Sequence, residues 1–124
     1  MKVCIRDAMI AGALPVVLSA CAMTPPASRE EIASVRRALN ECLSHWAVSL
    51  DDGISPADVI GHQAAQRCVG ESNEFTRVLI QGKSEGYAYG ATQAAPRARA
   101  DYATGVVLEH RALGVKNASD KSEA

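Results

Sequence analysis

The sequence predicts an all-α protein, a small bundle of three to four helices that follows a cleaved N-terminal signal. Two observations predict the helical class: apolar residues recur at steps of three and four, and strand-type alternation is nearly missing. A third observation supports this class: capping residues, glycines and prolines divide the chain into segments of helical length. We expect a signal over residues 1–20, a tether over 21–27, a helical domain over 28–115 and a disordered tail over 116–124.

The first helix is expected to begin at Ser28 and to end near Leu50. Ser28 stands three residues before Glu31, which is the spacing of a capping box. Acidic and glycine residues at 51–53 end the helix. Its apolar residues form one face at steps of three and four: Ile32, Val35, Leu39, Cys42, Trp46 and Leu50.

A second helix is expected to begin at Ser55 and Pro56, with the serine as cap and the proline at the first helical position. Gly70 marks its end. The residues of its inner face share the same helical spacing: Ala57, Ile60, Ala64 and Cys68.

A third helix is expected from Ser72 until Pro96, because the residue before a proline leaves helical geometry. Gly82, Gly86 and Gly90 would give this helix a small residue at every fourth position along one face. A last helix is expected over residues 97–113. Its candidate core residues are Tyr102, Ala103, Val106, Val107 and Leu113.

The N-terminal segment has the pattern of a secretory signal: a short charged head, an apolar stretch over residues 8–18 and small residues before Cys21. The sequence Leu18-Ser19-Ala20-Cys21 resembles the lipobox of bacterial lipoproteins. That resemblance implies cleavage before Cys21 and a diacylglycerol on its thiol. Ala22 in place of an aspartate implies an outer-membrane location facing the periplasm rather than the inner membrane. More than one acyl chain gives stable anchoring.

The charge balance excludes some partners. Without residues 1–20 the chain carries eleven basic and thirteen acidic residues, and the basic ones are not clustered. A nucleic-acid partner is therefore not expected. The membrane contact is expected through the N-terminal lipid alone, in the bacterial cell envelope.

Cys42 and Cys68 are expected to form a disulfide bond, since an even pair of thiols in an exported domain is typical of one. One alternative is two buried thiols. Another is a zinc site with His45 and His62, which the step from His62 to Cys68 disfavours because six residues turn a helix by about 240°. Each cysteine lies late in its helix, so perfect antiparallel alignment would separate the two. We therefore expect the second helix to cross the first at an angle, or the connection from Leu50 to Ser55 to let it fold back. The sequence leaves both open.

No catalytic motif is recognisable. The Gly82-Lys83-Ser84 sequence lacks the earlier glycine of a phosphate loop, where Arg77 stands instead. The three histidines lie on separate segments, and no serine or cysteine has the context of a nucleophile. We expect no enzyme activity, no metal and no cofactor.

The predicted role is therefore a structural or protein-interaction role in the envelope. The partner is expected to be another envelope protein or a second copy. The predicted contact surface comprises Gly82, Gly86, Tyr87, Tyr89 and Gly90, since small residues at helical spacing let another helix approach closely. One alternative is a frayed, flexible helix at the glycines. Alternative functions are a binding module for a hydrophobic molecule or a peptidoglycan fragment and, third, a small hydrolase.

Overall fold

The fold is known from a computed structural model that describes the backbone of residues 24–122 and the side chains of residues 24–114. The predicted signal peptide and the lipobox cysteine Cys21 lie outside the described residues. The described chain is an all-α bundle of four helices, which confirms the predicted fold class. The helices are α1 (Arg29–Leu50), α2 (Ala57–Arg67), α3 (Val69–Ile80) and α4 (Glu85–Ser122).

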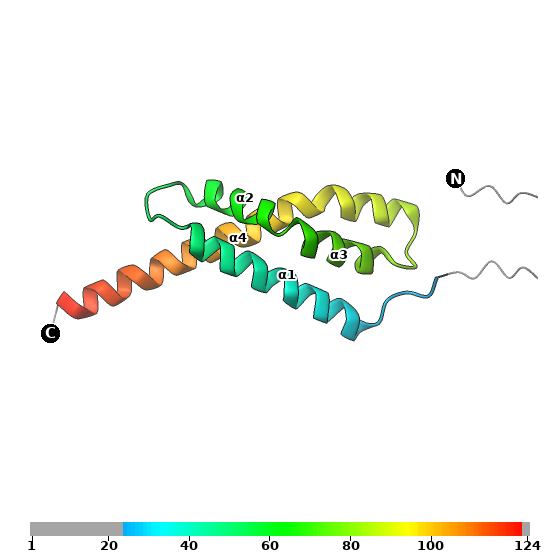
Figure 1. Cartoon of the computed structure of the whole chain (residues 1–124), viewed down its shortest axis with the longest axis horizontal. Coiled ribbons are helices and arrows are strands. Elements are labelled where there is room, and N and C mark those ends of the chain that lie inside the picture. The colour runs from blue at the N-terminus through cyan, green and yellow to red at the C-terminus, as the bar shows by residue number, and fades with distance from the viewer. Residues whose placement is uncertain (1–23, 123–124) are drawn as a thin grey trace, which may run out of the picture.

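The four helices form three rods (Figure 1). α1 is the first rod, and α2 and α3 follow each other closely to form a second rod that runs back along α1. α4 is the third rod and returns beside the others. Its last turns extend beyond the loop that joins α1 to α2. The bundle therefore has a loop end, where residues 51–56 join α1 to α2, and a turn end, where residues 81–84 join α3 to α4.

The start of α1 agrees with its predicted cap. The Ser28 side chain accepts a hydrogen bond from the backbone N–H of Glu31 at 3.1 Å. This bond satisfies one of the N–H groups that a helix leaves without a partner in its first turn. Glu30 and Glu31 also place negative charge at the positive end of the helix dipole.

The core lies between α1, α2 and the middle of α4. On α1 the buried face is centred on Leu39, Leu43 and Ala47, whereas the predicted Cys42 and Trp46 lie partly buried beside it. The core residues of the other helices are small or β-branched: Ile60, Ala64, Ala65, Cys68, Ala100, Ala103 and Val107. Small side chains let the rods approach closely. Of the predicted core residues on α4, Tyr102 and Leu113 are exposed instead.

The second and third helices divide differently from the prediction. α2 ends at Arg67, the backbone bends at Cys68, and α3 begins at Val69 rather than Ser72. The cap of α2 is Pro56, and no side chain bonds to the N–H groups of its first turn. The bend lets Cys68 turn into the bundle.

The helix expected to extend to Pro96 is in fact two helices. α3 ends at Ile80, and α4 begins at Glu85 and continues through Pro96. A proline inside a helix removes one backbone hydrogen bond, here the one to the carbonyl of Thr92, and typically costs about 3 kcal/mol. Packing of α4 against the other rods outweighs this cost. Residues 116–122, which the sequence places in a tail, continue α4.

Candidate functional site

The candidate site is an apolar groove of about 510 Å³ between α3 and the first half of α4. α3 contributes Phe75, Thr76 and Leu79 to its lining. Nearly all the residues from α4 are small: Gly86, Tyr87, Gly90, Ala91, Ala94, Ala95 and Ala98. Because these side chains end at Cβ or lack it, the backbone of α4 is accessible to another helix.

Gly86 and Gly90 face open space. A Cβ added at either position would meet no neighbouring atom within 4 Å. No described segment of the chain therefore covers this part of α4. A Gly86 side chain could extend outward without disturbing the bundle.

Gly82 does not lie on the same face as Gly86 and Gly90, and this corrects the predicted surface. It lies in the turn between α3 and α4 with a φ of 69°, a conformation that glycine adopts at little cost. The prediction that all three glycines share one face was wrong because it required one continuous helix from Ser72. The glycine at 82 ends a helix, whereas the other two lie within the next one.

The tether before α1 packs on this turn. A Cβ at Gly82 would come within 2.8 Å of the backbone nitrogen of Pro26. Beside it, the side-chain amide of Gln81 donates a hydrogen bond to the carbonyl oxygen of Pro25 at 3.0 Å. The described part of the tether is thus held at the turn end, at the same end of the bundle as Gly86.

One of the two predicted tyrosines lines the groove. Tyr87 lines it and is 47% exposed, and Tyr89 is 70% exposed. Exposed aromatic side chains are typical of protein contact surfaces, where they become buried without losing many rotamers. The structure therefore brings together Gly86, Gly90 and Tyr87 in the groove, whereas Tyr89 does not line it and Gly82 lies in the turn.

The disulfide bond predicted between Cys42 and Cys68 is present, with the Cα atoms 6.0 Å apart. It joins α1 to the bend between α2 and α3. α1 continues for eight residues beyond Cys42, and α2 returns over eleven residues before Cys68, so an antiparallel pair brings the two cysteines level. The expectation that antiparallel alignment would separate the cysteines was wrong, because Cys42 lies well before the end of α1.

The zinc alternative loses its sulfur ligands in this arrangement. The carboxylate of Glu71 lies near both sulfur atoms. Zinc binds cysteine as the thiolate, and the two sulfur atoms of a disulfide bond are not thiolates. His45 instead stacks edge-on against Trp46, and His62 contacts the backbone carbonyl of Asp58.

Asp51 forms a charged cluster with Arg111 and His110. The sequence did not predict this cluster, because residues 51–53 indicated only the end of a helix. Its side chain is 3% exposed, and Arg111 donates to it from Nη2 at 2.6 Å and from Nε at 3.0 Å. His110 Nδ1 lies 3.3 Å away. The bonds from Arg111, and after them the backbone N–H of Gly53, hold the pKa of Asp51 well below its ordinary value.

The neighbouring residues complete a clamp across the loop end. Arg111 also donates to the backbone carbonyl of Ser55 at 2.8 Å. The Ser55 hydroxyl donates to Asp52, not to His110. This bond, together with the backbone N–H groups of Ser55 and Ile54, lowers the pKa of Asp52 to about 2. A carboxylate with so low a pKa is too weak a base to take the serine proton at neutral pH. We therefore interpret the cluster as a structural clamp that ties α4 to the loop.

Searches for relatives add no family assignment: the chain matches no protein-family model, no curated protein and no solved structure. Among the described residues, no helix has both the length and the apolar character needed to cross a bilayer.

Proposed function

We propose that the protein is a lipid-anchored, non-catalytic component of the bacterial cell envelope whose α3–α4 groove binds a helix of another envelope protein. The observation that carries the proposal is the open groove at Gly86 and Gly90, lined by alanines and flanked by Tyr87. The groove lies outside the bundle core, so a helix can enter it without any rearrangement of the core. The lipid anchor is proposed from the lipobox resemblance at Leu18–Cys21.

A helix is the occupant that fits this groove best. Helices approach closely where small residues expose the backbone, and a ligand helix commonly places its apolar side chains between two receptor helices. Phe75 and Leu79 provide an apolar wall for such side chains. A bound helix would complete a local four-helix arrangement at the turn end, where α4 is otherwise covered on fewer sides.

The held tether supports a fixed placement of the groove relative to the membrane. Only three residue steps separate Thr24 from the proposed lipidated Cys21, a reach of about 10 Å. Since Pro25 and Pro26 contact the α3–α4 turn, the groove would begin close to the membrane surface. A partner anchored in the same membrane could then present its helix at the right height.

The anchor is tested by intact-mass measurement on protein from envelope fractions. We expect loss of residues 1–20 and added lipid mass on the remaining chain. Cys21→Ser should accumulate unprocessed and without lipid. A mature chain without added lipid would refute the anchor and leave the groove proposal to its own experiment.

The groove is tested in cells with a photo-crosslinking amino acid at Ala91, which lines it, and as control at Val59, which is exposed on α2. We expect a discrete product from the Ala91 position only. Gly86→Leu should remove this product because its side chain would fill the groove. Thermal melting of the purified variant checks that the fold is kept.

The mass of the crosslinked product distinguishes another protein from a second copy. A product of mixed composition supports the proposal, and a product of twice the chain mass replaces it with self-association. Crosslinking at Ala91 that Gly86→Leu leaves unchanged would contradict a role for the groove.

A further inference from the structure

A separate pocket of about 290 Å³ lies where α1, α3 and α4 meet. Its bed is apolar, and its walls carry polar groups from all three helices. The apolar lining residues are Leu39, Leu43, Phe75, Ala95 and Ala98. The polar lining residues are Arg36, Asn40, Ser72, Arg99 and Tyr102. Its volume is close to the lower limit of about 300 Å³ for small-molecule sites.

The pocket has a strong charge bias. Two of its lining residues are arginines, and none of them is acidic. The ion pairs found among residues 24–114 include neither Arg36 nor Arg99. This bias is local, because the whole chain carries a formal net charge of −1. An anion is the ligand that such a lining attracts.

Arg99 provides the most specific observation. Its Nε atom is buried and has no hydrogen-bond partner among the described residues. Buried polar atoms are nearly always paired, because leaving a charged donor unpaired costs more than an ordinary hydrogen bond contributes. An arginine presents its N–H groups in a planar fork that matches a carboxylate or a phosphate. Arg99 therefore lines the pocket with a guanidinium whose Nε–H group is satisfied by no described residue.

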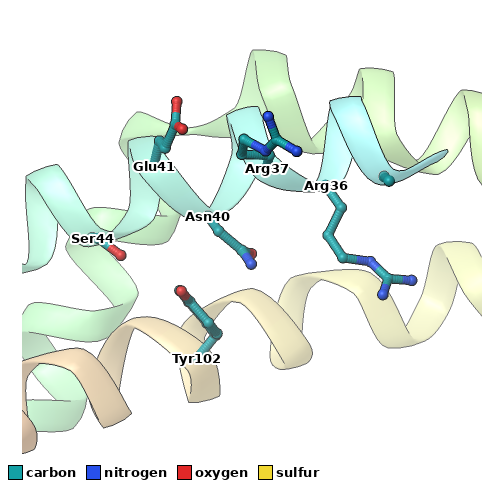
Figure 2. Close-up of a pocket in the computed structure, with 7 residues that line it drawn as sticks. Arg36, Arg37, Asn40, Glu41, Ser44 and Tyr102 are labelled. Carbon is teal, nitrogen blue, oxygen red and sulfur yellow. The ribbon is translucent and has the colours of Figure 1, made fainter. Parts of the chain in front are cut away.

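The other polar residues lie around the same opening. The Arg36 guanidinium lies 5.7 Å from the centre of the Phe75 ring, which holds it beside the apolar bed. Figure 2 shows the adjoining shallow cleft, where Arg36 extends from α1 toward α4 and the side chains of Asn40 and Tyr102 point toward each other. Arg36, Asn40 and Tyr102 line both the cleft and the pocket.

We propose that this pocket binds an amphipathic anion, with an acyl chain or aromatic ring on the apolar bed and an acidic head group held by Arg99 and Arg36. A neutral hydrophobic molecule would leave Arg99 unpaired. A free inorganic anion would leave the apolar bed of the pocket exposed to water. A ligand with both parts satisfies both surfaces, and its head group is a carboxylate or a phosphate monoester.

This site is distinct from the helix-binding groove. The two share Phe75, Ala95 and Ala98, but neither arginine lines the groove. Gly86 lines the groove and not the pocket. Gly86→Leu should therefore leave ligand affinity unchanged, so the two proposals can fail separately.

The test uses the chain from Thr24, which contains all four helices and the disulfide. Calorimetry compares decanoate, decyl phosphate and decanol. We expect at least one of the two anions to bind at least tenfold more tightly than decanol, because only an anion can form charge-assisted hydrogen bonds with the arginines. Preference for decanoate identifies a carboxylate head and preference for decyl phosphate a phosphate head. Equal binding of all three, or binding of none, overturns the proposal.

The matched variants are Arg99→Met and Arg97→Met. Both remove one arginine from α4, but Arg97 has a 90% exposed side chain and pairs with Asp101. We expect Arg99→Met to weaken binding of the preferred anion at least tenfold and Arg97→Met to leave it unchanged. Equal effects of the two variants would overturn the assignment. Should Arg99→Met fail to fold, Arg99→Lys, which keeps the charge and loses Nε, is expected to weaken binding by a smaller factor, and unchanged binding would count against the site.

Discussion

The two ends of the bundle hold α4 in different ways. At the loop end Arg111 of α4 is bonded to the buried Asp51, and Gly61 of α2 lies so close to α4 that a Cβ would come within 2.8 Å of the Ala100 carbonyl oxygen. At the turn end a Cβ on Gly86 or Gly90 would meet nothing within 4 Å.

The core follows the same division. The buried cluster is built from α1, α2 and the part of α4 beyond residue 99, and it includes Cys68 at the bend between α2 and α3. In the described part of α3 only Ser72 and Val78 are buried. From this difference we expect the loop end to carry more of the stability than the turn end. The following predictions break or sharpen this division, from the largest effect to the smallest.

Reduction of the disulfide should lower the free energy of unfolding more than any of the other changes. The bond closes a separation of 26 residues, and the chain-entropy model gives about 3.5 kcal/mol for such a loop. Urea unfolding of the chain from Thr24 with and without reductant measures the difference. The same reductant should not affect a variant with alanine at both cysteine positions. A stability loss well below 1 kcal/mol would mean that the core alone holds α1 to α2.

Removal of the charge on Asp51 should have the next largest effect. Asp51→Asn leaves the Arg111 guanidinium without its charged partner in a partly buried site, and we expect a loss of about 2–3 kcal/mol at pH 7. Asp101→Asn is the matched control, because that carboxylate is 70% exposed and pairs with the exposed Arg97. The control should change stability by less than about 1 kcal/mol.

The same variant has a pH signature. Because folding lowers the pKa of Asp51, its contribution is complete above the unfolded value near 3.8 and is lost as pH falls through the folded value. The stability of the wild type should therefore drop below about pH 4, and Asp51→Asn should flatten this part of the curve. If the stability of both proteins fell in parallel as the pH is lowered, Asp51 would not be the cause of the acid-induced loss of stability.

Gly61→Ala tests the close approach of α2 to α4. The new methyl group would collide with the Thr104 hydroxyl and with backbone atoms of α4, which cannot move independently. Overpacking of this kind typically costs about 1–3 kcal/mol, and we expect about 2 kcal/mol in urea unfolding. Thr104→Ala in the same chain should restore only part of the loss, since the backbone contact remains. An unchanged midpoint would mean that the helices separate at little cost.

Local signals predicted the parts of the fold that depend on neighbours in sequence. Ser28 caps α1 because its acceptor and the Glu31 N–H are three residues apart, a relation that holds in any fold. The cysteine pair was predictable from its number and from the expected export. Gly82 was misplaced because a glycine at helical spacing looks the same within a helix and at its end. Pro96 was misplaced because tertiary packing outweighed a local preference.

The remaining features depend on residues far apart in the chain. Asp51 and Arg111 are separated by 60 residues, and the sequence around neither one indicates the other. Arg36 and Arg99 come together only because α1 and α4 meet at the pocket. Of the predicted contact surface, Gly86 and Gly90 share a groove because both lie within α4.

The smallest predicted effect has the opposite sign. Gly86→Ala makes the same chemical change as Gly61→Ala, but its methyl group enters open space. An interior helical glycine costs up to about 1 kcal/mol relative to alanine, mainly through the freedom it gives the unfolded chain. We therefore expect Gly90→Ala, within α4, to raise the stability of the isolated chain by about 0.5–1 kcal/mol, and Gly86→Ala, at the second residue of α4, to raise it by less. Thermal and urea unfolding of the chain from Thr24 provide the measurement. A loss of stability in either variant would show that an unseen contact covers the turn end. A gain, beside the loss at Gly61, would establish that one end of α4 is packed and the other is free.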